Sequence, residues 1–367
     1  MKDTSVEIKS DLPVKDKGIE AFLSGKEVAG IGTAYAHKLV EKYGTDAVRI
    51  LRDEPDSISG ITGLGDSRIK AASESLSQLK RPLDLILFLY SCGVPEMYID
   101  RIFGKYRNKA KDIIIEDPYQ MVENVWRLSF FTADKIGMAL GISADDPGRI
   151  RGALLTAIKH YAENGHLFAT PEQAVEYASG ITGVAKEKVA ENIESLVADK
   201  RIVASRGGLY LPVYYEAEHN GARRLMELAS AHVSSPDINA LPACDIHGHN
   251  YTPHQKEAMI MAAGNPVTVL TGGPGSGKTT VLKGILDYFS RKGLKFTLVA
   301  PTGRAAKRMA SLTGYEASTI HHLLGYRQGE GYYNKSIDTD LLVIDEGSMM
   351  EQVLFDHLLE AVKPGTR

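Results

Sequence analysis

The sequence has few of the features that mark secreted, membrane or metal-held proteins. Its two cysteines, Cys92 and Cys244, stand far apart, which excludes a disulfide framework and favours a reducing, cytoplasmic setting. The N-terminus alternates charges and lacks the apolar core of a signal peptide. The most apolar run, LDLILFLYSCGV, is too short to span a bilayer and contains Asp84, so we expect no membrane contact.

The charges are nearly balanced, with 43 Lys and Arg against 46 Asp and Glu. Net charge therefore does not attract nucleic acid, and any such binding must come from local patches. What is present is an ordinary globular composition, 43% hydrophobic and 24% charged. Over 367 residues it is enough for two or three domains with sizeable cores.

The N-terminal half is rich in short helical patterns. Residues 1–25 are polar and predict a flexible lead-in, and residues 26–145 predict a helical DNA-binding region. Within it, AGIGTAYAHKLVEKYG and ITGLGDSRIKAASESL repeat one unit, an apolar-Gly-apolar-Gly turn followed by an amphipathic helix. The glycines that permit positive φ in these turns are Gly30, Gly32, Gly63 and Gly65. Residues 127–142 have the helix but lack the paired glycines.

Residues 146–240 predict a winged-helix-like domain. Helical patterns at 149–163 and 185–199 precede RIVASRGGLYLPVYY, whose alternation around Gly207-Gly208 predicts a hairpin. The turn-rich segment 234–250 predicts a linker.

Residues 251–367 alternate between predicted strands and helices. We expect strands at 266–272, 295–300 and 340–346, and this alternation predicts an α/β domain with a parallel sheet. The predicted fold class is therefore a multidomain chain, with a helical N-terminal half followed by an α/β P-loop domain.

GGPGSGKT, residues 272–279, matches the phosphate-loop pattern G-x-x-x-x-G-K-[ST] between a predicted strand and a predicted helix. Gly275 and Gly277 would let N–H groups point inward, Lys278 would reach the β- and γ-phosphates, and the Thr279 hydroxyl would ligate Mg²⁺. The alternative is a chance glycine-rich turn. We expect ATP and Mg²⁺ as ligands. The candidate nucleotide-binding residues are Gln255, Gly273, Pro274, Gly275, Ser276, Gly277, Lys278, Thr279 and Thr280.

LLVIDE would deliver Asp345 and Glu346 at the carboxyl end of a strand, where open α/β sheets bind ligands. Asp345 can hold Mg²⁺ through its water shell, and Glu346 can orient and deprotonate the attacking water. Taken alone, two acids after an apolar strand are a common solvated strand end. Glu after Asp favours a nucleotide hydrolase over a small-molecule kinase.

Two further groups allow two interpretations each. Gln255 is either a polar residue on a helix face or an adenine reader through its amide, and spacing alone favours the first. Thr302, Gly303 and Arg304 follow the second predicted strand and precede a helix, a geometry that contacts phosphate. An ordinary turn with a basic solvated helix explains them equally well.

The N-terminal turns offer backbone N–H groups and helix N-termini that can grip DNA phosphates without reading sequence. The segment MYIDRIFGKYRNKAK, residues 97–111, carries five Lys or Arg against one Asp, with aromatic residues between them. It could supply charge and stacking, or it could be a helix with a solvated basic face.

TGGPGSGKTT, APTGRAAKRM, ASTIHHLLGY and LLVIDEGSMM, in this order and spacing, resemble the RecD-like (RecD/TraA) branch of superfamily-one DNA helicases. The hairpin repeats and GARRLMELAS resemble the long form of bacteria, with N-terminal helix–hairpin–helix repeats, so the resemblance covers about residues 26–367. It implies an ATP-dependent helicase of DNA repair or recombination that moves 5′ to 3′ on single-stranded DNA, or on DNA with a single-stranded tail. We expect a cytoplasmic monomer.

The resemblance also assigns site residues by motif. Gln255 would read adenine, and Asp345 and Glu346 would serve Mg²⁺ and water. The single-strand path would be lined by Thr302, Gly303, Arg304, Thr319 and His321.

The sequence departs from the family pattern after the two acids. Family members continue into a Gly-Asp-x-x-Gln-Leu-Pro motif and a second RecA-like domain, whose arginine finger contributes on the order of 10³–10⁵ in rate. This sequence stops at EAVKPGTR. We therefore expect an incomplete motor that binds DNA, binds ATP weakly and does not unwind. The alternatives are a non-unwinding DNA-binding module with a vestigial nucleotide site, and another P-loop ATPase such as an AAA-type remodeller.

Overall fold

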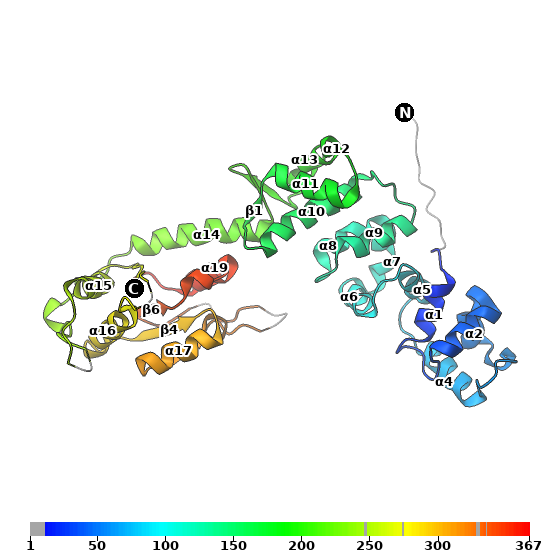
Figure 1. The fold of residues 1–367 in the computed structure, drawn as a ribbon, viewed down its shortest axis with the longest axis horizontal. Coiled ribbons are helices and arrows are strands. Elements are labelled where there is room, and N and C mark those ends of the chain that lie inside the picture. Colours follow the sequence, from blue (N-terminus) through cyan, green and yellow to red (C-terminus); the bar gives the residue numbers. More distant parts are fainter. Residues whose placement is uncertain (1–11, 246–247, 274, 328–330, 335) are drawn as a thin grey trace. The chain divides into compact units, whose positions relative to one another are not determined.

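The computed structural model describes residues 12–245, 248–273, 275–327, 331–334 and 336–367. The chain forms two compact units, Met1–Leu211 and Pro212–Arg367, which we describe separately (Figure 1). Among the described helices, none combines the length and apolarity needed to cross a lipid bilayer.

The first unit begins with short helices around an apolar core that continues to the end of the unit. These helices are α1 (Asp16–Leu23), α2 (Thr33–Tyr43), α3 (Ala47–Asp53), α4 (Asp66–Ser77), α5 (Leu83–Ser91), α6 (Glu96–Tyr106), α7 (Ala110–Glu116), α8 (Met121–Asn124) and α9 (Phe130–Ala139). Helix α1 corrects the expected lead-in, because Ile19, Phe22 and Leu23 recur at helical spacing, are fully buried and pack α1 against α5. Residues 1–11 of that lead-in lie outside the described residues.

Four turns of one form precede α2, α4, α6 and α9. Each has a residue of positive φ, then an apolar residue that is buried, then the N-cap of the helix. The turns are Gly30-Ile31-Gly32, Gly63-Leu64-Gly65, Gly93-Val94-Pro95 and Arg127-Leu128-Ser129. The sequence pattern found the first two turns, but only their first glycines, Gly30 and Gly63, have the expected positive φ. Gly32 and Gly65 are N-caps in an extended conformation, with φ −93° and −87°. It missed the third turn, where proline replaces the second glycine. In the fourth turn it did not identify Arg127, which stands where the other turns have glycine and has φ 57°.

Tyr119 fills a space between α9 and α10 (Pro147–Glu163) that two glycines leave open. A Cβ on Gly137 would clash with Tyr119 Oη, and a Cβ on Gly152 would lie 2.9 Å from Tyr119 Cβ. The Tyr119 hydroxyl donates to Asp134 Oδ1 at 2.9 Å, and Arg149 Nε donates to the same oxygen at 2.7 Å. This contact joins the hairpin region to the helices that follow.

The rest of the first unit forms a winged-helix-like arrangement, as predicted. Its other elements are α11 (Pro171–Thr182), α12 (Lys186–Ala190), α13 (Ile193–Ala198), β1 (Phe168–Ala169), β2 (Val203–Ser205) and β3 (Gly208–Tyr210). The strands form an antiparallel sheet in the order β1-β3-β2. Arg206 and Gly207 join β2 to β3, and both have positive φ, as a two-residue hairpin turn requires. The single helix predicted over 185–199 is divided into α12 and α13.

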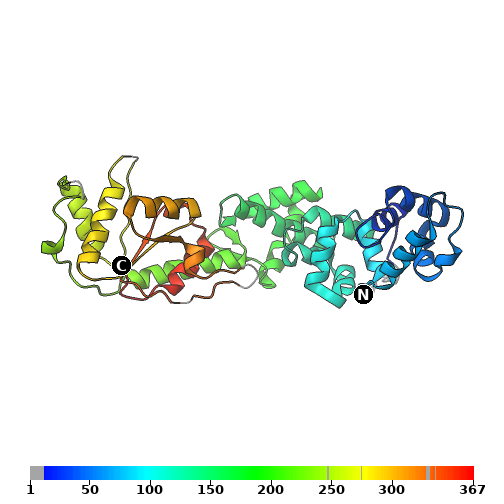
Figure 2. The same cartoon turned by 90° about the horizontal axis from the view of Figure 1, so that it is seen from below.

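The second unit is an α/β domain whose described strands form a parallel sheet in the order β5-β4-β6. Its elements are α14 (Pro212–Ala229), α15 (Pro253–Gly264), α16 (Lys278–Arg291), β4 (Phe296–Ala300), α17 (Gly303–Thr313), β5 (Ala317–Thr319), α18 (Ile320–Leu323), β6 (Leu341–Ile344) and α19 (Gln352–Ala361). Leu298 packs with α15, α16 and α17 on one face, whereas its neighbour Val299 packs with α18 and α19 on the other. Figures 1 and 2 show α17 and α19 on opposite sides of the sheet.

Helix α14 lies with the second unit rather than with the winged-helix-like elements. Gln352 of α19 donates its side-chain amide to the Ala217 carbonyl at 3.2 Å, and Arg224 forms an ion pair with Asp356. The boundary in the structure therefore falls between Leu211 and Pro212. The PVYY residues begin this helix instead of extending the preceding strand.

The strand predicted over 266–272 does not form. These residues make no ladder, and Val269 and Leu270 are 85% and 41% exposed. The edge of β6 away from β4 pairs instead with the main chain of Arg367. Leu342 N donates to Arg367 O at 2.8 Å, and Arg367 N donates to Asp340 O at 3.0 Å. A strand is stabilised by a neighbour that pairs with its backbone groups, and no described part of the chain pairs with this segment.

Candidate nucleotide and DNA sites

The phosphate loop leads into α16 and is built on two glycines in the left-handed region. Gly277 is the N-cap of α16 with φ 88°, and Gly275 has φ 74°. A Cβ on Gly273 or Gly275 would meet no atom within 4 Å, so the loop has open space before it. Two glycines in this conformation let successive N–H groups point inward, and such a backbone can hold an anion at the helix N-terminus. Pro274 lies outside the described residues.

Lys278 lies folded over the loop that it follows. Its ammonium donates to the carbonyl oxygens of Gly272 and Gly273, the latter at 3.0 Å. The side chain is exposed, whereas Thr279 and Thr280 are half-buried in the first turn of α16. An anion bound in the loop could accept a hydrogen bond from this ammonium in place of the two neutral carbonyls. A hydrogen bond between two charged groups is stronger than one to a neutral carbonyl.

Gln255 has two roles in the structure, one at each end of its side-chain amide. Thr252 N donates to Gln255 Oε1 at 2.9 Å, and Gln255 N donates to Thr252 Oγ1 at 3.2 Å, so the two residues form a capping box that starts α15. The Nε2 end points to the phosphate loop, because a Cβ on Gly277 would lie 2.7 Å from it. The structure thus places Gln255 beside the loop, which spacing alone did not indicate.

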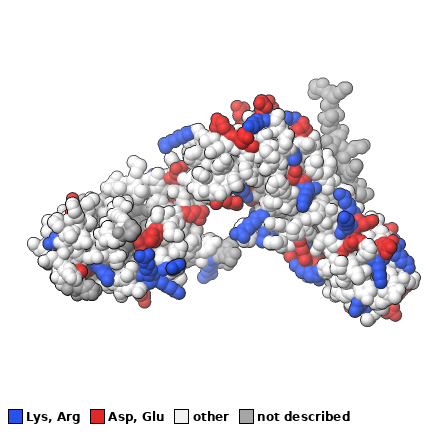
Figure 3. All heavy atoms as spheres, viewed as in Figure 1, with Lys and Arg blue, Asp and Glu red and all other residues white. Residues whose placement is uncertain are grey.

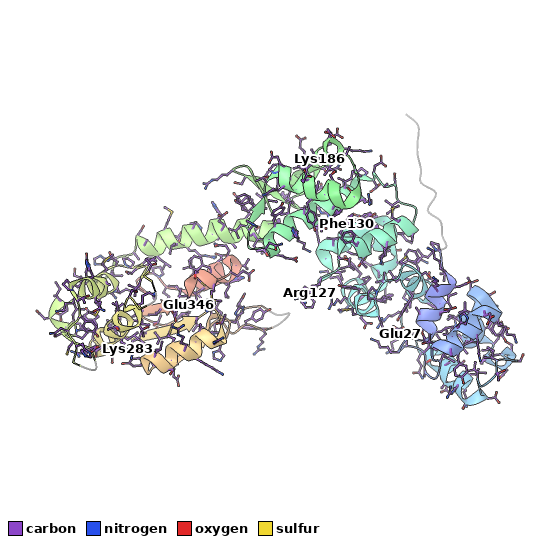
Figure 4. The ribbon with its side chains drawn as sticks, in the orientation of Figure 1. Glu27, Arg127, Phe130, Lys186, Lys283 and Glu346 are labelled. Atoms are coloured by element: carbon purple, nitrogen blue, oxygen red, sulfur yellow. The ribbon has the colours of Figure 1, made fainter. Side chains whose placement is uncertain are left out.

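Asp345 and Glu346 directly follow β6, as predicted. Asp345 N donates to Val299 O of the neighbouring strand at 2.9 Å, and Asp345 Oδ1 accepts from Glu346 N at 3.0 Å. Glu346 has φ 53° and an exposed side chain, and Figure 4 labels it at the end of β6. Within the described residues, no hydrogen bond or ion pair joins either acid to the phosphate loop, which follows the unpaired segment 266–272.

The predicted DNA-path residues of the second unit gather at one end of the sheet. Ala300 pairs with Thr319 across β4 and β5, and a Cβ on Gly303 would lie 4.0 Å from Thr319 Cγ2. Thr302 and Thr319 are the N-caps of α17 and α18, where their hydroxyls accept from Ala305 N at 3.2 Å and His322 N at 3.1 Å. Two helix N-termini therefore lie together at the strand ends.

Basic side chains cover the exposed face of α17. Arg304, Lys307 and Arg308 are all exposed, and Figure 3 shows Lys and Arg gathered over this helix. Positive charge beside two helix N-termini favours a phosphate backbone.

His321 lies in an aromatic cluster that the sequence pattern did not single out. Its ring centre is 5.2 Å from that of Tyr326 and 6.2 Å from that of Tyr332, and Tyr332 is 4.4 Å from His357. The signal for this cluster was the spacing of aromatic residues in HHLLGYRQGEGYY. These rings offer stacking surfaces beside Thr319.

The first two hairpins of the N-terminal unit pack on each other reciprocally. A Cβ on Gly30 would lie 3.4 Å from Arg68 O of α4, and a Cβ on Gly63 would lie 3.0 Å from Tyr35 Oη of α2. Arg68 and Tyr35 are the third residues of their helices, and the guanidinium carbon lies 5.2 Å from the tyrosine ring centre. The second glycine of each turn, Gly32 or Gly65, faces open space. The N-termini of α2 and α4 are thus open to an anion such as a DNA phosphate.

Fold and site together define a P-loop nucleotide-binding domain that follows tandem helix–hairpin–helix units. Residues 255–367 match the model of a family described as AAA domain, and residues 80–168 match that of the ATP-dependent RecD2 DNA helicase HHH domain. The predicted resemblance to the RecD-like helicases is thereby confirmed.

Several curated proteins are similar to the chain. It is 31% identical to the ATP-dependent RecD2 DNA helicase of Deinococcus radiodurans over 96% of its own length and 52% of that protein. It is 31% identical to the RecBCD enzyme subunit RecD of Mycolicibacterium smegmatis, over 43% of the chain and 33% of that subunit. The RecD subunit of Haemophilus influenzae is 36% identical over 32% of the chain and 22% of the subunit. The chain spans about half the length of the Deinococcus protein.

Proposed function

We propose that this chain is the DNA-binding and first motor portion of an ATP-dependent DNA helicase, and that it couples ATP hydrolysis to DNA binding. The observation that carries the proposal is the phosphate loop. Gly275 and Gly277 take the left-handed conformation before α16, and Lys278 lies over the same loop. The same chain carries helix–hairpin–helix turns whose helix N-termini face open space.

Each nucleotide contact has a residue that suits it. The loop N–H groups would hold the phosphates, and Lys278 would exchange its two carbonyl partners for phosphate oxygens. Gln255 Nε2, beside the loop, would read the adenine edge. Glu346 would orient the attacking water and accept its proton.

Magnesium fits the residues at this site only together with nucleotide. Among the described residues, no group of three or more His, Cys, Asp or Glu side chains could hold a metal ion. Thr279 and Asp345 would therefore share the ion with phosphate oxygens, and the ion would neutralise their charge.

The DNA partner we propose is single-stranded DNA, or DNA with a single-stranded tail, in a cytoplasmic repair or recombination process. Thr302, Gly303, Arg304, Thr319 and His321 would line the strand in the second unit, while the hairpins would hold the backbone. Movement 5′ to 3′ and action as a monomer rest on the resemblance to the RecD-like family alone.

A second candidate is a non-unwinding DNA-binding module with a vestigial nucleotide site. Two observations favour it. Residues 266–272 stand outside the sheet, and within the described residues neither Asp345 nor Glu346 forms a hydrogen bond or ion pair with the phosphate loop. On this proposal the hairpins would bind DNA and ATP would not be hydrolysed.

Steady-state ATP hydrolysis with and without single-stranded DNA separates the two candidates, with Lys278→Ala as the control. Hydrolysis that rises with DNA and vanishes in the control is the result expected of the motor. Hydrolysis at the level of the control, with DNA binding intact, would contradict the motor and support the binding module. The binding itself is measured by the fluorescence anisotropy of a labelled oligonucleotide.

A further inference from the structure

An exposed stack of aromatic and guanidinium groups lies at the fourth hairpin. Trp126 is 62% exposed, and the guanidinium carbons of Arg101 and Arg127 lie 4.8 Å and 4.7 Å from its ring centre. Arg101 also lies 5.2 Å from the ring centre of Tyr98, one turn away on α6, and donates to the Trp126 carbonyl at 3.0 Å. We name Tyr98, Arg101, Trp126 and Arg127 the Trp126 stack.

One member of the stack, Arg127, has an unfavourable backbone conformation that the packing of its turn maintains. Arg127 occupies the position that glycine takes in the other three hairpins, and its φ of 57° is unfavourable for a side chain with a Cβ. Leu128 is buried and Ser129 accepts from Thr132 N at 3.2 Å, so the turn and α9 form as in the other hairpins. The strained residue thus carries its cation to the outer surface, whereas Phe130 lies in the core (Figure 4).

Carboxylates close to the stack in the sequence are paired with other cations. Glu123 accepts a bidentate pair from Arg201, and Asp134 accepts one from Arg149. Asp100, next to Arg101 in the chain, is paired with Lys26 and Arg81. Within the described residues, Arg101 and Arg127 form no ion pair, so two uncompensated positive charges stand on exposed aromatic surface.

We propose that the Trp126 stack binds single-stranded DNA, with an unpaired base stacked on the aromatic and guanidinium planes and its phosphates at Arg101 and Arg127. Flat exposed rings and planar cations suit a base and a phosphate together. In duplex DNA the bases already stack on one another, so this surface selects single strands. The proposal deepens the proposed function, because it rests on DNA binding by this chain.

The chain provides its own probe for this test, because Trp126 is its only tryptophan. Fluorescence excited at the red edge of absorption, where tyrosine does not contribute, is recorded while an unlabelled poly-thymidine oligonucleotide is added to the full chain. We expect Trp126 quenching to saturate at the same protein-to-DNA ratio as the anisotropy change measured with a dye-labelled copy of the oligonucleotide. A blunt duplex of equal charge should cause much less quenching.

Substitutions then measure what the stack contributes. We expect Trp126→Ala to weaken single-strand binding about 5- to 100-fold, and Trp126→Phe to restore much of it. Arg127→Gly introduces the residue of the other three hairpins, so it should fold, and we expect it to lower the salt dependence of binding by about 0.7 in the log–log slope. Arg49→Gln also removes one positive charge, but Asp46 and Glu54 already pair with it, so it should change neither the single-strand affinity nor its salt dependence.

The outcomes separate this inference from the proposed function. No anisotropy change with any DNA would contradict the proposed function and this inference with it. Binding that leaves Trp126 fluorescence and the Trp126→Ala affinity unchanged would overturn this inference alone.

Discussion

Gln255 Nε2 lies 2.7 Å from the point where a Cβ would stand on Gly277, so the amide that starts α15 also closes one side of the phosphate loop. Gly277 has φ 88°, which disfavours alanine even without that neighbour. We expect Gly277→Ala to weaken ATP binding by at least about tenfold, since a strain of 1.4 kcal/mol is enough for that factor. Gly293→Ala is the matched control, because Gly293 also has positive φ, at 65°, and open space at its Cβ position, but it follows the far end of α16. Equal losses in the two variants, measured by calorimetry, would argue against this geometry.

Two substitutions of Gln255 separate the capping role of its amide oxygen from the nucleotide contact proposed for its amide nitrogen. Gln255→Glu keeps an oxygen that accepts from Thr252 N, so α15 should remain capped while the amide donor is lost. We expect unchanged thermal stability and a reduced preference for ATP over GTP in competition binding. Gln255→Ala should show the same change of preference and also lose about 0.5–1 kcal/mol of stability with the cap. An unchanged preference in both variants would leave Gln255 only its capping role.

Glu346 combines a proposed catalytic role with an unfavourable backbone, since its φ is 53°. We expect Glu346→Gln to bind ATP normally and to lose about 10²–10⁴ in hydrolysis, because the amide cannot accept the proton of water. Glu346→Gly should lose hydrolysis equally and gain up to about 1 kcal/mol in stability, because glycine accepts the left-handed conformation. Turnover that persists in the Gln variant would assign the proton transfer to another group.

The ion pair between Arg149 and Asp134 should govern the stability of the first unit. Its two hydrogen bonds measure 2.7 Å and 3.1 Å, and the Arg149 side chain is only 7% exposed. Removing one partner leaves a buried charge, so we expect Arg149→Met to cost about 3–5 kcal/mol. Arg49→Met, at an exposed pair, should cost less than about 1 kcal/mol. Urea unfolding followed by Trp126 fluorescence reports on this unit, and similar midpoints for the two variants would contradict the prediction.

The two cysteines should differ strongly in reactivity. Burial raises the pKa of the Cys92 thiol to about 12, whereas Cys244 is exposed. The thiolate is the reactive form, so Cys92 should remain protonated and inert at mildly alkaline pH. We expect Cys244 to be alkylated first and Cys92 more than about 100-fold more slowly until urea unfolds the chain. Peptide mass mapping after a timed reaction gives both rates, and comparable rates would show that the Cys92 region opens readily.

Local patterns predicted the parts of the structure that depend on local chemistry. Gly30 and Gly63 revealed their hairpins because glycine signals positive φ. The hairpin expected around Gly207-Gly208 also formed, although its turn is Arg206-Gly207 and Gly208 begins β3. Arg127 gave no such signal, since tertiary packing rather than residue type imposes its conformation. The apolar residues 266–272 read as a strand, yet a strand also depends on a neighbour that local sequence does not reveal. Likewise, the phosphate-loop motif predicted Gly275, Gly277 and Lys278, but not the closeness of Gln255 to Gly277.

The fit of Tyr119 between Gly137 and Gly152 limits how this chain can diverge. A methyl group on Gly137 would clash with the tyrosine ring and its hydroxyl, one on Gly152 would lie 2.9 Å from Tyr119 Cβ, and the hydroxyl also donates to Asp134. A larger residue at either glycine therefore requires a smaller one at 119, and that exchange leaves Asp134 with one donor fewer. Related sequences should thus keep these three residues as a set or replace them as a set, and a chimera that mixes the two sets should fail to fold although each parent is stable.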